Sequence, residues 1–152
     1  MIAITEFMGW PVRRLLLPAD EQIICLYCRI GDEPVLSLHD ANHNVFRLDK
    51  HGKVIWQITR INYPDTDWEL KHKLAREKGQ SGCIEPFLRF YVTYADGTQK
   101  TDPHTGMAPD IIDWVPGCTV KLASLGLGTQ WFTLDVGAGV AVEITPRGFK
   151  AW

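Results

Sequence analysis

The sequence is 152 residues long, 45% hydrophobic and 22% charged, with a formal net charge of -2. This length suits one domain with a substantial core and is too short for two full-sized domains, so we expect a single domain over residues 1–152. A weak net charge and a pI near 6.2 provide no general attraction for nucleic acid or anionic membranes. We therefore expect neither as a partner.

The N-terminal segment MIAITEFMGWPVRRLLLP contains no basic region ahead of an apolar run and no small-residue cleavage site. It does not have the pattern of a secretory signal, and no apolar run reaches the roughly 18 residues that a membrane span requires. The four cysteines are too irregularly spaced for the disulfide framework of a small secreted domain. We expect a soluble, cytoplasmic protein with free, mostly buried thiols.

Short runs of β-branched and aromatic residues recur along the chain, separated by Gly, Pro, Asn and Asp, and their alternation is typical of strands. They predict about nine strands, in VRRLLL, QIICLYCRI, PVLSLH, NVFRLD, KVIWQITRI, PFLRFYVTY, CTVKLASL, TQWFTLD and VAVEIT. Tight turns are expected in DKHGK, ADG and GAG, where Gly52, Gly97, Gly137 and Gly139 can adopt positive φ.

One segment, DTDWELKHKLAREKG, departs from the strand pattern. Thr66 and Glu69 have the spacing of a capping box and Gly79 is a stop signal, which predicts one α-helix over about residues 66–78. The predicted fold is mainly β: a small antiparallel barrel or a two-sheet sandwich with this single inserted α-helix.

The predicted helix has a basic side, which in most proteins is simply a solvated face. Its alternative role is a surface for an anion or a partner, with Trp68, Lys71 and Arg76 as candidate binding residues. Most tryptophans are expected in the core. Trp114, beside a Pro-Gly turn, and Trp152, at the end of the sequence, are the ones that could mark a binding surface.

The stretch CLYCRIGDEPVLSLHDANH has the one spacing that matches a known chemical motif. It raises the alternative of a structural zinc-binding module through Cys25, Cys28, His39 and His43. In a strand, however, Cys25 and Cys28 project to opposite faces, which makes Cys28 a core residue on an apolar face. The two histidines lie among turn formers and predict a polar corner, whereas finger histidines share one face of a helix. We expect no metal site and no cofactor.

The most irregular stretch is the loop TDPHTGMAPD at residues 101–110, and loops of this kind often carry function. His104 beside Asp102 could form an acid–base pair, although Asp-Pro-His-Thr-Gly is equally a common polar turn. Nucleophile elbows, P-loops and dinucleotide fingerprints are absent from the sequence. We therefore expect a module that binds a small ligand or an unknown protein, with a small acid–base enzyme around His104 as the alternative.

Overall fold

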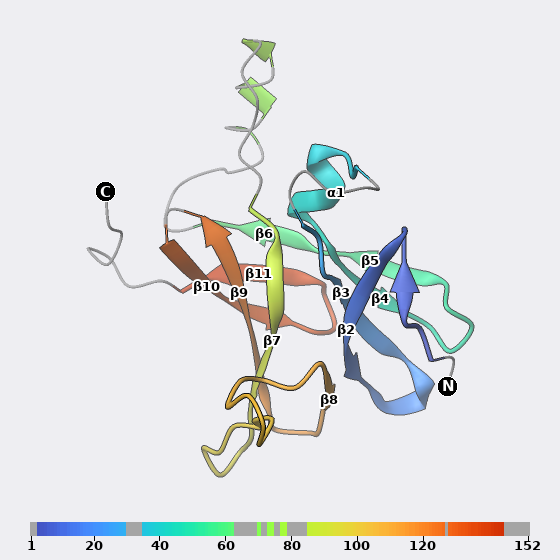
Figure 1. Ribbon diagram of the computed structural model, residues 1–152, viewed down its shortest axis with the longest axis vertical. Coiled ribbons are helices and arrows are strands. Elements are labelled where there is room, and N and C mark those ends of the chain that lie inside the picture. The colour runs from blue at the N-terminus through green and yellow to red at the C-terminus, as the bar shows by residue number, and fades with distance from the viewer. Residues whose placement is uncertain are drawn as a thin grey trace.

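The computed structural model of the chain describes residues 3–29, 35–62, 70, 73–74, 77–78, 85–126 and 128–144. The predicted mainly β fold is confirmed: a curled half-barrel sheet is accompanied by a second sheet. Figure 1 shows the two sheets side by side.

The first sheet is built from the N-terminal part of the chain and one later strand. In spatial order its strands are β1 (Glu6–Phe7), β2 (Trp10–Leu16), β3 (Gln22–Leu26), β4 (Val45–Leu48) and β5 (Val54–Gln57). A later strand, β8 (Ile111–Asp113), pairs in parallel with β2. The short 3-10 helix η1 (Pro18–Asp20) joins β2 to β3.

The second sheet is built mostly from the C-terminal part of the chain. In spatial order its strands are β6 (Thr59–Ile61), β11 (Val140–Glu143), β10 (Gly128–Asp135), β9 (Thr119–Gly126) and β7 (Phe87–Thr93). The pairing of β6 with β11 is parallel and the others are antiparallel. Each of the two parallel pairs joins segments that lie far apart in the sequence.

The chain passes from the first sheet to the second at Ile58. The Ile58 N–H donates to Val45 O at 2.9 Å in the first sheet, and the next N–H, of Thr59, donates to Gly139 O at 2.8 Å in the second. The run KVIWQITRI, predicted as one strand, is therefore two strands, because the chain changes sheet in its middle.

On the opposite side, side chains rather than a strand connect the two sheets. The Asn44 amide donates to Phe87 O at 2.8 Å and to Leu26 O at 2.9 Å, and it accepts from the Phe87 N–H at 2.9 Å. Arg13 donates to Leu88 O at 2.8 Å. These side chains satisfy backbone groups at the edge of β7 that, within the described ranges, no strand pairs on this side.

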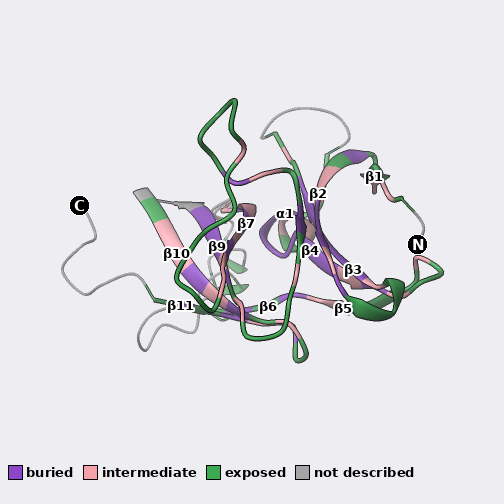
Figure 2. Cartoon of the chain, turned by 90° about the horizontal axis from the view of Figure 1, so that it is seen from below, coloured by how far each residue is buried: buried purple, intermediate pink, exposed green. Residues whose placement is uncertain are grey.

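The main core lies between the two sheets, and a smaller core lies on the other face of the first sheet, so β3 is buried on both faces. Figure 2 shows buried residues concentrated in β2, β3 and β4. Cys25 and Cys28 do project to opposite sides, as predicted. Cys25, expected on the mixed face, is fully buried in the main core, whereas Cys28 is only half-buried against the smaller one.

The run PVLSLH does not form the predicted strand. Its described part leads into the helix α1 (Leu38–Asn42), and the Ser37 hydroxyl caps that helix by accepting from the Asp40 N–H at 3.0 Å. The predicted polar corner at HDANHN is therefore wrong. A local capping interaction outweighs the strand propensity of the preceding apolar residues.

The helix predicted at residues 66–78 falls mostly outside the described residues, as do Trp68, Lys71 and Arg76. Within this range, four described residues are helical, and the Lys78 N–H donates to Leu74 O at 3.1 Å. In the described part of the chain, no helix is both long and apolar enough to cross a membrane.

Gly139, in the predicted GAG turn between β10 and β11, has a φ of +72°, and Trp56 lies directly against it. An added Cβ would lie 2.5 Å from Trp56 Cδ2, and the indole N–H of Trp56 donates to Val136 O at 3.1 Å. We expect Gly139→Ala to lower the free energy of unfolding, measured in urea, by about 2 kcal/mol through strain and displacement of the ring.

Gly97→Ala is the matched control, because Gly97 has a φ of +86° but no atom within 4 Å of an added Cβ. Gly97→Ala should lower the free energy of unfolding by only about 1 kcal/mol, through conformational strain alone. Equal losses in the two variants would show that the Trp56 contact contributes nothing to the effect.

Candidate functional site on the second sheet

The outward face of the second sheet carries a row of side chains at matching positions of its five strands. Tyr91 of β7 is paired with Lys121 of β9, which is paired with Thr133 of β10. Thr133 is in turn paired with Val142 of β11, and Val142 with Ile61 of β6. Paired residues share a face of a sheet, so these side chains form one outer row.

Two aromatic rings meet on this outward face. Trp131 and Tyr91 contact each other edge to face, with ring centroids 4.9 Å apart and an interplanar angle of 65°. This geometry is favourable for aromatic pairs. Ala123, which is paired with Trp131 and lies two residues from Lys121, is only 1% exposed. A small residue at this position allows the two rings to close over β9.

Exposed apolar side chains lie on the same outward face as the aromatic pair. The Ile144 N–H donates to Trp131 O at 2.7 Å, which places Ile144 beside Trp131. Ile144 is 40% exposed, and in the outer row Val142 and Ile61 are 41% and 48% exposed. Contiguous exposed apolar surface of this kind marks binding sites more often than scattered single residues do.

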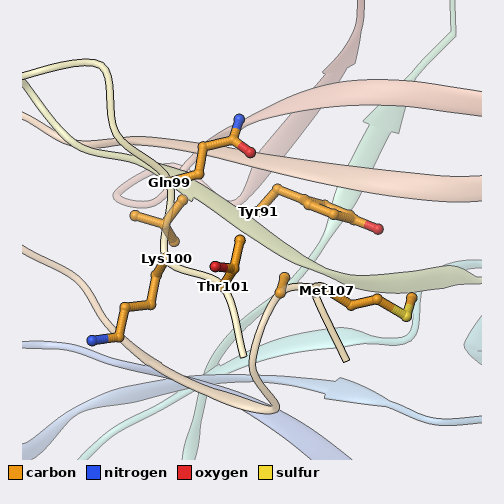
Figure 3. A pocket seen from close by; sticks show the side chains of 8 residues that line it. Tyr91, Gln99, Lys100, Thr101 and Met107 are labelled. Atoms are coloured by element: carbon orange, nitrogen blue, oxygen red, sulfur yellow. The ribbon is translucent and has the colours of Figure 1, made fainter. Parts of the chain in front are cut away.

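A hollow of about 420 Å³ opens at this place, lined by Tyr91, Gln99, Lys121, Trp131 and Ile144. A smaller hollow of about 190 Å³ lies on the other side of Tyr91 and Gln99, against the 101–110 loop. Figure 3 shows the smaller hollow, where Met107 extends in the same direction as the Tyr91 side chain and Lys100 points the other way. Tyr91 and Gln99 thus form a wall shared by both hollows.

The charge at the larger hollow is positive. Lys121 is the one described lining residue that is charged at neutral pH. Among the described residues, no carboxylate lies within ion-pair distance of its ammonium group. The described lining of the hollow therefore combines aromatic walls, one apolar side chain, one amide and one cation.

The predicted acid–base pair is brought together only through the backbone. Asp102 Oδ1 accepts from the His104 N–H at 2.8 Å, which is a polar turn, and the His104 side chain is exposed. Asp110, at the end of the same loop, pairs with Arg13 Nε at 3.1 Å. The loop does reach the smaller hollow, through Thr101 and Met107, but His104 and Asp102 do not line either hollow.

Trp114 is half-buried against the main core, and its backbone N–H donates to Leu16 O at 2.8 Å. Its packing is that of a core residue at the β2–β8 pair, and it does not line either hollow. Trp152, the other tryptophan singled out from the sequence, lies outside the described residues.

The cysteines and histidines of the zinc-like spacing do not converge. The Cys25 thiol donates to Phe87 O at 3.4 Å, and burial raises the pKa of Cys25 to about 12 and that of Cys28 to about 11. Both thiols are thus held in the protonated form, which is a poor metal ligand. His39 and His43 stack with ring centroids 4.1 Å apart, and His43 Nδ1 lies 2.6 Å from His39 O. Within the described ranges, no three His, Cys, Asp or Glu side chains are grouped to hold a metal ion.

Sequence reasoning missed the residues of the larger hollow. In TQWFTLD, Phe132 and Leu134 face inward, so Trp131 and Thr133 face outward. Strict period-two alternation along this run could therefore have assigned Trp131 to the solvent face. The pairing of Tyr91 with Lys121 needs the register of strands β7 and β9, which no local pattern provides.

Comparisons with models of protein families, with curated proteins and with solved structures find no match for this chain. What the outward face can bind therefore has to be inferred from its own geometry and chemistry.

Proposed function

We propose that this protein is a binding module that holds a small organic ligand with a flat apolar group in the larger hollow of the second sheet. The observation that supports this most directly is the Trp131–Tyr91 pair, which lies beside exposed Ile144 at an open hollow. The hollow's volume falls within the roughly 300–1,000 Å³ typical of small-molecule sites. Aromatic walls with a few polar groups are also typical of such sites.

Binding is favoured over catalysis by the residues present. Acid–base chemistry near neutral pH generally uses His, Asp or Glu, and none of these is among the described residues that line either hollow. A small acid–base enzyme around His104 remains the alternative, and an activity that disappears in His104→Ala without a change in stability would favour it.

We place this module in the cytoplasm. The thiols of Cys25, Cys28 and Cys118 are free, and free thiols are usual in reducing compartments. The proposed binding requires a free outward face on the second sheet, because an oligomer formed through this sheet would cover the hollow.

The proposal predicts that Trp131→Ala weakens the binding of flat ring compounds by about tenfold, since the contact surface of an aromatic ring contributes 1–2 kcal/mol. Titration of 15N-labelled protein with benzamide, followed by NMR, measures the dissociation constant directly. In the unmodified protein the largest shifts are expected at Tyr91, Lys121 and Ile144.

Tyr27→Ala is the matched control, because Tyr27 is also an aromatic residue, 40% exposed, but follows β3 in the first sheet. It should leave benzamide binding unchanged. Shifts centred on Tyr27 or on the 101–110 loop alone, or equal affinity in Trp131→Ala and the unmodified protein, would contradict the proposed site.

A further inference from the structure

The position of Lys121 is set by strands on both sides. Tyr91 and Thr133 pair with it from β7 and β10, so it lies on an interior strand, next to the edge strand β7. The side chain is half-buried and lines the larger hollow beside the aromatic pair. A lysine stem on aromatic surface keeps its ammonium group at the solvent side of the hollow.

Two other half-buried cations, Arg13 and Arg47, have carboxylate partners, whereas half-buried Arg89 donates to the backbone oxygen of Ala108 at 3.0 Å. Arg13 pairs with Asp110 at 3.1 Å and Arg47 with Glu21 at 2.6 Å. Lys121 differs from them, since no described carboxylate is within ion-pair distance. A positive charge at a hollow that is also lined by two aromatic rings, with no carboxylate partner in the described part of the chain, is complementary to an anionic ligand.

Gln99 provides a second donor at the same hollow. Its Nε2 donates to Thr93 Oγ1 at 3.3 Å, which orients the amide. An amide nitrogen has two protons, so one N–H of Gln99 can still donate to a ligand. Lys121 and Gln99 together offer donors for the two oxygens of one carboxylate.

We infer that the ligand of the larger hollow is a small monocarboxylate whose flat apolar body packs on Trp131 and Tyr91 while its carboxylate pairs with Lys121. This inference rests on the proposed function. Lys100, which lines the smaller hollow, is not among the described residues that line the larger one, and it points away from Tyr91 (Figure 3). With one cation among the described lining residues, the site fits a monoanion better than a doubly charged phosphate group.

The test compares benzoate with benzamide, which has the same ring without the charge. By NMR titration, the unmodified protein should bind benzoate about fivefold more tightly, the preference expected of a solvent-accessible ion pair. Lys121→Gln should remove this preference and leave benzamide binding unchanged, while Lys121→Arg should keep it. Lys53→Gln, an exposed change in the β4–β5 hairpin, should have no effect.

The preference for benzoate should also decline as KCl is raised, because salt screens the pairing. Equal affinity for benzoate and benzamide in the unmodified protein, or an unchanged preference in Lys121→Gln, would overturn the carboxylate inference and leave the proposed binding site standing. Failure of both compounds to shift the resonances of the hollow would overturn the proposed function itself. Tighter binding of inorganic phosphate than of benzoate would overturn the inferred ligand class.

Discussion

Replacing Arg60 with Met is expected to lower the free energy of unfolding by about 4 kcal/mol, because it leaves buried groups without their charged donor. Arg60 is 2% exposed. Its Nη1 donates to Asn42 O at 3.1 Å and to Glu85 O at 2.7 Å, its Nη2 to Ser124 Oγ at 3.4 Å, and its Nε to Asn62 Oδ1 at 3.4 Å. Met fills similar space but provides no donor to these oxygens.

The guanidinium group also packs against aromatic rings of the main core. Its central carbon is 4.7 Å from the Phe87 ring centroid and 5.1 Å from that of Phe132. Arg60 thus connects β6, the end of α1 and the residues before β7 through one side chain. A planar group with several donors suits this position, so Arg60→Lys should recover only part of the loss.

Urea unfolding monitored by circular dichroism measures this effect, with Arg29→Met as the control. Arg29 is exposed, and its central carbon is 5.7 Å from the Tyr27 ring centroid, so its replacement should cost less than about 0.5 kcal/mol. If Arg60→Met were as stable as Arg29→Met, the buried hydrogen bonds of Arg60 would make no net contribution.

Arg60 also shows the boundary between what local sequence can and cannot predict. Its strand was expected, since KVIWQITRI has strong β propensity, but the change of sheet at Ile58 is set by partners distant in the chain. Val45 and Gly139, which receive the successive hydrogen bonds, are 94 residues apart by their numbering. Propensity identifies extended segments but does not identify their neighbours.

The turns were predicted more accurately than the sheets, because turn chemistry is local. Gly52, Gly97 and Gly139 adopt positive φ as predicted, whereas Gly137, the fourth glycine predicted to do so, does not. Ser37 is the opposite case: a local cap was present in the sequence, but the apolar residues around it favoured a strand, so α1 was missed.

The candidate site was missed for a physical reason. Trp131 and Tyr91 are 40 residues apart by their numbering, and they meet only because both flank β9 on its outward side. Taken alone, each strand has the residue pattern of an ordinary half-buried strand. Lys121 likewise has the pattern of a solvated residue until the register places it between Tyr91 and Thr133, at a hollow that Trp131 also lines.

Asn44→Ala is expected to cost about 3 kcal/mol of unfolding free energy, because it leaves buried backbone groups without hydrogen-bond partners. Asn44 is fully buried, and its side chain bonds to Leu26 O and to both backbone groups of Phe87. After the substitution Phe87 O keeps the Cys25 thiol as a donor at 3.4 Å. The Phe87 N–H and Leu26 O lose their side-chain partner.

Gln57→Ala is the matched amide control for this prediction. The Gln57 amide donates to Asp40 Oδ1 at 2.9 Å and to His43 O at 3.1 Å but is only half-buried, so its loss should cost about 1 kcal/mol. Hydrogen exchange adds a local measurement: the Phe87 amide should exchange faster in Asn44→Ala, relative to the Phe90 amide of the same strand. If the two amides kept the same ratio of exchange rates as in the unmodified protein, Asn44 would not be what protects the edge of β7 between the two sheets.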